Sequence, residues 1–451
     1  MASLCVVIVF LMPMPRLYAQ EWSFHQSEID DFYAKRAGRS LWIKDRKLNS
    51  AGIQLWRALS ESWQHGLNPK NYHTNEISYI LSHTQYKNSA DPDLSLKLEL
   101  LLTDGYIRYA RDLSGMRIRA SALGLDEQDW QQRKSVKYVL SRLFESADNT
   151  KQLLQALEPQ TATYQHLKQE MHNVFQAQQS DDKERKIAQI IVNMERLRWV
   201  ADEKPQRFIV VNIPSEQLWA IENKKVRISM PVAVGSKKRP TRPFVTQIRG
   251  VRFNPAWTIP DTIKREDIWP QLRQNARYLE DKGVELFSGY GANALTLDPS
   301  AIDWKGISKQ ELASLRMVQV PGNHNPLGQI RLLMPNRYGI YLHDTNDKSV
   351  FARDERDVSS GCIRMSEPEK MAGFVLQHTQ SWTKQQSVSS ALKTKQTRDV
   401  YAIESAKLYL VYYTIWLGEK QQIIYGSDIY GRDERLLREL EKLDALPPLK
   451  G

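Results

Sequence analysis

Cys362 and His343 are the two residues of this sequence whose types and spacing could do chemistry. Cys362 is the only cysteine outside the extreme N-terminus and ends the run Ser-Ser-Gly-Cys, while His343 ends a short apolar run that starts at Gly339. A thiol attacks a carbonyl as the thiolate, and a free thiol with a pKa of roughly 8.5 needs a nearby base at neutral pH. The pattern therefore predicts Cys362 as a nucleophile and His343 as its general base. The alternative is that Cys362 is a small buried hydrophobe, as many lone cysteines are.

The loop around the cysteine has the composition of an oxyanion site. A glycine before a nucleophile lets backbone amides approach a developing negative charge. We therefore predict that the backbone amides around Gly361 and Cys362, in the loop that includes Ser360, stabilise an oxyanion.

Three further side chains are candidates for substrate binding. Tyr341 stands two residues before His343 and so points to the same side of a strand, where it either leans into the cleft or packs across strands. Arg364 is expected to order the catalytic loop or to bind a peptide carboxylate, the alternative being a plain surface position. Trp257 either presents its ring to a substrate or packs in the core.

A metal site is the competing interpretation of the same residues. His324, His343, Asp344 and Cys362 are the metal-binding types available, but their spacing matches none of the usual zinc patterns. The sequence therefore predicts neither a metal nor a cofactor.

Two short motifs carry a family resemblance. The string HDT at 343–345, followed after a charged loop by SSGCIR at 359–364, resembles the active-site signature of the L,D-transpeptidases of the YkuD-like fold. Most of that family has a histidine directly before Gly-Cys, whereas Ser360 stands here, as in the large periplasmic YcbB-like branch. Further matches to that branch are NPAWTIP at 254–260, PGNHNPLGQI at 321–330, MPN at 334–336 and SDIYGRD at 427–433.

The resemblance implies a function as well as a fold. It implies an enzyme that makes 3→3 cross-links in peptidoglycan through a cysteine thioester, with a tetrapeptide stem as donor and the diamino acid of a second stem as acceptor. It also implies that carbapenems acylate the cysteine, that cell-wall synthases are partners, and that an insertion at 261–320 caps the cleft.

Periodicity divides the chain into two halves. Apolar residues recur at helical spacing up to about residue 199, as at Leu98, Leu101 and Leu102, which predicts an all-helical scaffold domain over 20–200. From residue 205 short strands bounded by Gly, Pro and Asn predict a mainly β catalytic domain over 205–445. The fold class predicted is therefore α+β, with no room between the halves for a separate peptidoglycan-binding module.

Details of the second half follow from the same pattern. The insertion is expected to hold helical patches at 263–278 and 308–317. The strands at 408–417 and 421–426 are expected to form a hairpin that returns to the main sheet.

The N-terminus and the charge bear on location and partners. The apolar run Leu4–Met12, followed by a small-residue site that ends at Ala19, predicts a signal peptide over 1–19 and hence export to the periplasm. The formal net charge is +11, but the basic residues are scattered without the basic stripe and stacking aromatics of nucleic-acid modules, so nucleic acid is not predicted as a partner.

Two rival functions stay open on sequence alone. The same site could hydrolyse the tetrapeptide as an L,D-carboxypeptidase or exchange its terminal D-amino acid. Alternatively, the chain could be a non-catalytic envelope scaffold whose helical half holds partners.

Overall fold

The computed structural model describes residues 25–86, 92–146, 149–201, 204–379, 382 and 387–447. The predicted signal peptide at 1–19 lies outside these residues. The chain forms two compact units, which we call the helical unit (Met1–Ile118, Gln131–Val200 and Leu437–Gly451) and the sheet unit (Arg119–Trp130 and Ala201–Leu436). Among the described helices, none combines the length and the apolar character that a membrane crossing requires.

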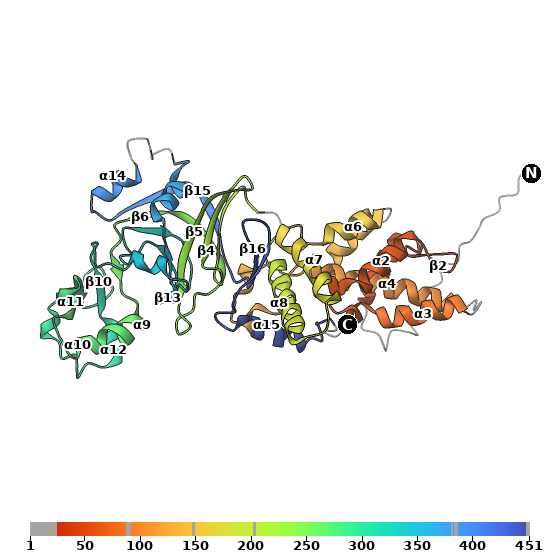
Figure 1. Ribbon diagram of the computed structural model, residues 1–451, viewed down its shortest axis with the longest axis horizontal. Coiled ribbons are helices and arrows are strands. Elements are labelled where there is room, and N and C mark those ends of the chain that lie inside the picture. The colour runs from red at the N-terminus through yellow and green to blue at the C-terminus, as the bar shows by residue number, and fades with distance from the viewer. Residues whose placement is uncertain are drawn as a thin grey trace, which may run out of the picture. The chain divides into compact units, whose positions relative to one another are not determined.

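Helices with one apolar face build the helical unit (Figure 1). Their apolar faces bury one core, in which Leu101 and Leu102 are fully buried. Side-chain caps fix the starts of four of them: Asn49, Ser135, Asn149 and Ser180 each accept a backbone N–H of the first turn. A two-stranded hairpin, β1 (Ile43–Lys44) with β2 (Lys47–Leu48), and an isolated parallel bridge between Met116 and Gln132 depart from the predicted all-helical pattern. The helices are α1 (Gln26–Lys35), α2 (Ser50–Ser60), α3 (Thr74–Tyr86), α4 (Pro92–Leu113), α5 (Val136–Glu145), α6 (Thr150–Leu157), α7 (Ala162–Gln176) and α8 (Asp181–Arg198).

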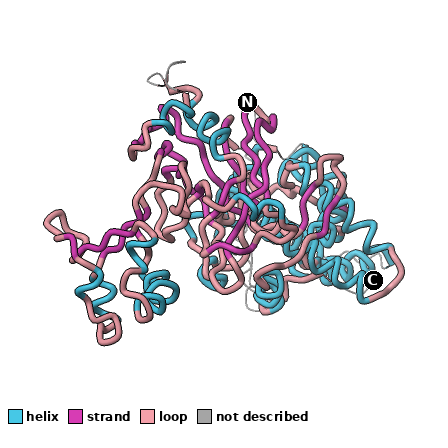
Figure 2. The backbone as a smooth tube through the Cα atoms, turned by 60° about the vertical axis from the view of Figure 1, so that its left-hand side comes forward, coloured by secondary structure: helices cyan, strands magenta, loops and turns pink. Residues whose placement is uncertain are grey.

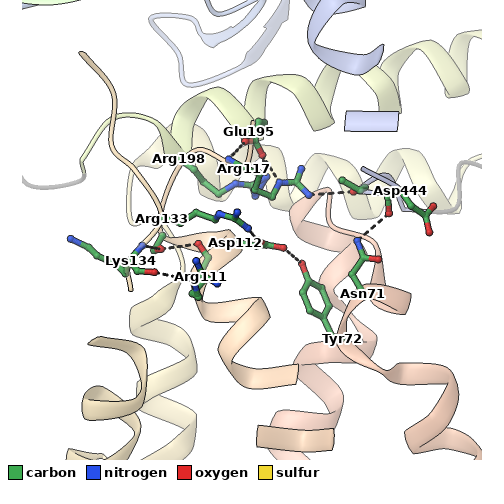
Figure 3. Close-up of polar contacts among 12 residues, drawn as sticks. Asn71, Tyr72, Arg111, Asp112, Arg117, Arg133, Lys134, Glu195, Arg198 and Asp444 are labelled. Carbon is green, nitrogen blue, oxygen red and sulfur yellow. Dashed lines mark hydrogen bonds and ion pairs between the residues drawn. The ribbon is translucent and has the colours of Figure 1, made fainter. Parts of the chain in front are cut away.

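A buried ion network lies at the end of α8 (Figure 3). Glu195 pairs with Arg117 (Nε to Oε2, 2.7 Å) and Arg198 (Nη2 to Oε2, 3.1 Å), and it also accepts the indole N–H of Trp199. Burial alone would raise the pKa of Glu195, but the two guanidinium charges and their hydrogen bonds lower it to about 2. Arg117 also donates to the carbonyl of Ala445, so the network ties the C-terminal segment to the unit.

Removing the charge of Glu195 should destabilise the helical unit. Glu195→Gln leaves Arg117 and Arg198 buried without a counter-charge, which costs about 3–5 kcal/mol. Because folding lowers this pKa from 4.5 to about 2, the stabilising effect is present above 4.5 and is lost as the pH falls towards 2. Urea unfolding of both proteins at neutral and acid pH measures the difference.

Glu145→Gln is the matched control. Glu145 pairs with Arg142 at 3.1 Å, but both side chains are about half exposed, so its removal should cost less than about 1 kcal/mol. Equal effects of the two substitutions would contradict the structural role of the Glu195 network.

The sheet unit is built on a nine-stranded sheet; strands are magenta in Figure 2. The strand order is β13-β5-β14-β12-β11-β6-β15-β3-β4, and a further pairing of β4 with β5 closes the sheet on itself. One face covers a large apolar core, to which α13 (Pro368–Leu376) contributes Met371 and Phe374. The strands are β3 (Arg207–Asn212), β4 (Gln217–Glu222), β5 (Lys225–Gly235), β6 (Phe244–Phe253), β11 (Ile330–Leu333), β12 (Leu342–His343), β13 (Asp357–Ser359), β14 (Ile363–Met365) and β15 (Arg398–Val411).

The insertion has a sheet and a core of its own. Three of its strands, β10 (Arg316–Gln319), β8 (Val284–Phe287) and β9 (Thr296–Leu297), form a sheet with β7 (Trp257–Thr258), which directly precedes the insertion. The strand order is β7-β10-β8-β9. Short helices pack on it around a separate apolar cluster that includes Trp304 and Met317. The prediction of helical patches alone was therefore incomplete, because four-residue strands are too short to show a period of two. The helical segments are α9 (Asp261–Ile263), a π-helix (Lys264–Ile268), α10 (Trp269–Leu272), α11 (Tyr278–Asp281) and α12 (Lys309–Ser314).

The predicted C-terminal hairpin was wrong in one respect. β15 belongs to the main sheet but ends at Val411, and the chain then pairs β16 (Ile415–Leu417) with β17 (Ile423–Tyr425) as a separate two-stranded sheet. The break falls where Tyr412 and Thr414 turn their hydroxyls to Asp428 and Asp433, side-chain bonds that compete with the sheet ladder. The last helix is α15 (Arg432–Glu441).

Candidate active site

A parallel pairing of two short strands brings the predicted nucleophile and base to one face. In β12 and β14, Leu342 lies opposite Ile363 and His343 opposite Arg364. Leu342 and Ile363 are fully buried in the core. Because side chains alternate along a strand, Tyr341, His343, Cys362 and Arg364 all project from the other face.

His343 is held as a neutral base. Its side chain is buried and its Nδ1 lies 2.5 Å from the carbonyl oxygen of Asp344. A carbonyl only accepts, so Nδ1 carries the proton and Nε2 is left as the basic nitrogen. Burial lowers the pKa of His343 to about 4, and the positive charges of Arg364 and Arg331 act in the same direction. The imidazole is therefore unprotonated at neutral pH.

Cys362 is partly exposed and rests against the backbone of the neighbouring strand. The amide of Tyr341 donates to its Sγ at 3.4 Å, and the thiol points to the carbonyl of Gly339 at 3.8 Å. Burial raises the pKa of the thiol, which the amide of Tyr341 and the charges of Arg331 and Arg364 partly offset. Within the described chain no hydrogen bond joins Sγ to His343. The resting pair is thus a thiol and a neutral imidazole.

Hydrogen bonds to neighbouring strands shape the loop before Cys362. Gly361 has φ +107°, a conformation that favours glycine. Its amide donates to Ser359 Oγ at 3.1 Å, and its carbonyl accepts from Thr241 Oγ1 at 2.9 Å. Ser359 Oγ in turn donates to the carbonyl of Cys362. The amide of Gly361 is therefore engaged, whereas that of Cys362 donates to no group in the described part of the chain.

Comparison with known proteins matches this arrangement to a family. Residues 206–388 match the family model described as the L,D-transpeptidase catalytic domain (YkuD), and residues 27–171 match the model described as the Scaffold domain. The chain therefore contains a YkuD L,D-transpeptidase catalytic domain and a Scaffold domain. The predicted fold class, a helical scaffold followed by a mainly β catalytic domain, is thereby confirmed.

Individual relatives of this chain are distant. A Haemophilus influenzae protein named "Putative L,D-transpeptidase" is 25% identical over 406 residues, which cover 90% of this chain and 78% of that protein. Two solved structures are an L,D-transpeptidase from Mycobacterium smegmatis (13% identical, 46% of this chain and 58% of that one, TM-score 0.21) and LD transpeptidase LdtMt1 in complex with imipenem (12%, 46% and 59%, TM-score 0.22). This chain spans less than two thirds of either solved chain, and overlays with such TM-scores say nothing about its own site.

Arg239 links the loop before Cys362 to the insertion. Its guanidinium binds both carboxylate oxygens of Asp267 (2.6 and 2.9 Å) and one of Glu266 (2.7 Å), which lie on the π-helix of the insertion. The same side chain donates to Ser360 Oγ at 3.0 Å. Departures from regular α-helix such as this π-helix often accompany functional sites. One arginine thus connects the insertion to Ser360, two positions before Cys362.

The other predicted binding residues are divided between two places. The ring of Tyr341 lies under the guanidinium of Arg331 at 4.5 Å, and half-buried Arg364 lies opposite His343. Trp257 instead packs against the core of the insertion. In the described chain it makes no hydrogen bond or ring contact with Cys362 or His343.

Two arginines at the site were missed by sequence reasoning. Arg331 lies opposite His343 on β11, and its signal in the sequence is a charged residue inside an otherwise apolar strand. Arg239 gave no signal, because the doublet Lys237-Lys238 beside it looks like an ordinary basic surface.

The pKa of the Cys362 thiol should lie above that of an ordinary cysteine. Burial raises its pKa, so the ultraviolet absorbance of a thiolate should be absent at neutral pH and appear only in alkaline solution. The acylation rate should fall in acid only near about 4, the pKa of His343, rather than near 6.5. Cys362→Ser supplies the baseline, and a thiolate signal already present at neutral pH would contradict a neutral resting pair.

Removing Arg239 should loosen the catalytic loop. In Arg239→Met the insertion loses its link to Ser360, so we expect faster hydrogen exchange at 264–268 and 359–362 and acylation slowed by about tenfold. Lys238→Met is the matched control, because Lys238 is 79% exposed and lies 3.9 Å from Glu266. Equal hydrogen-exchange and acylation rates in the two variants would show that the link from Arg239 to Ser360 does not order the loop.

Proposed function

We propose that this protein is an exported peptidoglycan L,D-transpeptidase that forms 3→3 cross-links through a thioester on Cys362. The observation that carries the proposal is the pairing of β12 with β14, which puts Cys362 and His343 on one face. The family match supports the reaction class. The substrate and the cross-link are our inference.

In the first half-reaction a tetrapeptide stem acylates the cysteine. The sulfur attacks the carbonyl of the third residue, a diamino acid, while Nε2 of His343 takes the thiol proton. The C–N bond to the terminal D-alanine then breaks, and the imidazolium returns that proton to the departing amine. Because both groups are neutral at rest, the charge pair forms only as the S–C bond forms.

The amide of Cys362 is the oxyanion donor that we assign to this step. The amide of Gly361 already donates to Ser359 Oγ, which leaves the Cys362 amide as the donor next to the reacting carbon. Fixed amides stabilise developing charge without reorganisation.

In the second half-reaction an amine replaces the sulfur. The side-chain amine of the diamino acid on a neighbouring stem attacks the thioester, His343 accepts its proton, and the C–S bond breaks to restore the thiol. Water would give hydrolysis instead, so excluding water favours transfer. We assign this role to the insertion, which Arg239 ties to the catalytic loop.

The proposed location is the periplasm. It rests on the apolar run Leu4–Met12 and the small-residue site ending at Ala19. The exported protein should begin at Gln20, which N-terminal mass analysis of periplasmic fractions would establish. A full-length chain retained in the cytoplasm would contradict export, and cell-wall synthases as partners would then lose their basis.

Product mass tests the proposed reaction. Purified protein incubated with tetrapeptide muropeptides should release D-alanine and yield a dimer that contains one tetrapeptide and one tripeptide stem. Cys362→Ala should abolish the dimer, and a carbapenem should add its mass to the parent protein but not to this variant.

Each other outcome points to a different function. Tripeptide without dimer would indicate an L,D-carboxypeptidase, and exchange of the terminal residue alone would indicate D-amino-acid exchange. An unchanged muropeptide mixture with no carbapenem adduct would leave a non-catalytic scaffold.

A further inference from the structure

A row of directly opposed residues crosses the sheet at the catalytic histidine. Asp399 of β15 lies opposite Arg252 of β6, which lies opposite Arg331 of β11, then His343 of β12 and Arg364 of β14. Opposed residues of paired strands project from the same face. The active-site face therefore carries three arginines and one aspartate beside the histidine.

This row carries more positive than negative charge. Arg252 is paired with Asp399 through two bonds, at 2.5 and 2.6 Å. Arg331 and Arg364 have neither an ion pair nor a side-chain hydrogen bond in the described chain, and His343 is neutral. Arg364 still lies in the field of Asp347, whereas the largest charge effect on Arg331 comes from the like charge of Arg252, with a smaller opposite effect from Asp399.

Arg331 is the more unusual of the two unpaired arginines. It is half-buried, and its Nε is shielded from solvent without a hydrogen-bond partner. The ring of Tyr341 stabilises the Arg331 cation from one face at 4.5 Å. It does not accept the guanidinium N–H groups, which point outward in the plane of the guanidinium. A shielded guanidinium without an acceptor is costly. Such a group is suited to an anion that arrives with the substrate.

We propose that Arg331 binds the terminal carboxylate of the donor stem peptide. The inference rests on the proposed function and deepens it, because it makes the enzyme selective for a donor with a free C-terminus. Only the amide nitrogen and one carbon separate the scissile carbonyl from that carboxylate. Arg331 and Cys362 both contact Tyr341: the guanidinium lies 4.5 Å from its ring, and Sγ accepts its amide at 3.4 Å. A carboxylate two atoms from the reacting carbon can therefore approach the guanidinium.

The planar guanidinium of Arg331 suits the binding of a carboxylate. A guanidinium binds a carboxylate through two parallel N–H bonds, and Lys cannot reproduce that arrangement. The leaving D-amino acid would be held while its amine takes the proton from His343.

Paired substrates test the inference. Acylation of the wild-type protein should favour a tetrapeptide with a free C-terminal carboxylate over the same peptide with a C-terminal amide. In Arg331→Gln, kcat/KM for the free acid should fall by about 10- to 100-fold, the loss typical of a charged hydrogen bond. The value for the amide should fall much less, because there only the effect of Arg331 on the charges of His343 and Cys362 is lost, so most of the preference disappears. Arg252→Gln is the matched control, because Arg252 lies in the same row but is already paired, and it should keep the wild-type preference.

The outcomes separate this inference from the proposed function. Wild-type protein that turns over neither peptide would refute the function itself. Turnover of the acid by wild type, with the full preference kept in Arg331→Gln, would overturn the inference alone. An equal loss on both peptides would also overturn it, since Arg331 would then only support the sheet. If Arg331→Gln does not fold, Arg331→Lys decides, with a smaller loss confined to the free acid expected.

Discussion

The parallel pairing of β12 with β14 is the constraint on which the rest of the site depends. These strands have two and three residues, too few to hold a register by themselves. They are held because β11 and β5 flank them in the sheet and because Leu342, Ile363 and Met365 are buried in the core on the opposite face. A slip of one residue would bury the imidazole and the thiol among those apolar side chains. The hydrophobic core thus sets the register that puts His343 and Cys362 on the same face of the sheet.

Low solvent exposure sets the charge state of this site. Burial opposes both the imidazolium and the thiolate, so the pair rests neutral. The positive charges of Arg331 and Arg364 disfavour the imidazolium of His343 and favour the thiolate of Cys362. The thiol therefore stays protonated at neutral pH. A lone thiol in an oxidising compartment would be protected in the same way, because thiolates are the reactive form.

Sequence reasoning could predict the parts of the site that have a local signature. The division into a helical and a mainly β half followed from periodicity, and the family was evident from HDT and SSGCIR. The contacts of Arg239 and Arg331 could not be predicted, since they depend on the order and register of strands far apart in the sequence. The carbonyl of Asp344 as the partner of His343 is a backbone feature without a sequence signal. The break after Val411 depends on side-chain bonds to Asp428 and Asp433, which no strand pattern shows.

The most direct test of the account is to trap the acyl-enzyme. A tetrapeptide donor offered without an acceptor amine, followed by acid quenching and peptide mapping, should place a tripeptide on Cys362 as a thioester. His343→Ala, which keeps the thiol but removes the base, should form the same adduct far more slowly. A tripeptide attached elsewhere, or an adduct that forms at an equal rate without His343, would contradict the central claim that this pair performs the reaction.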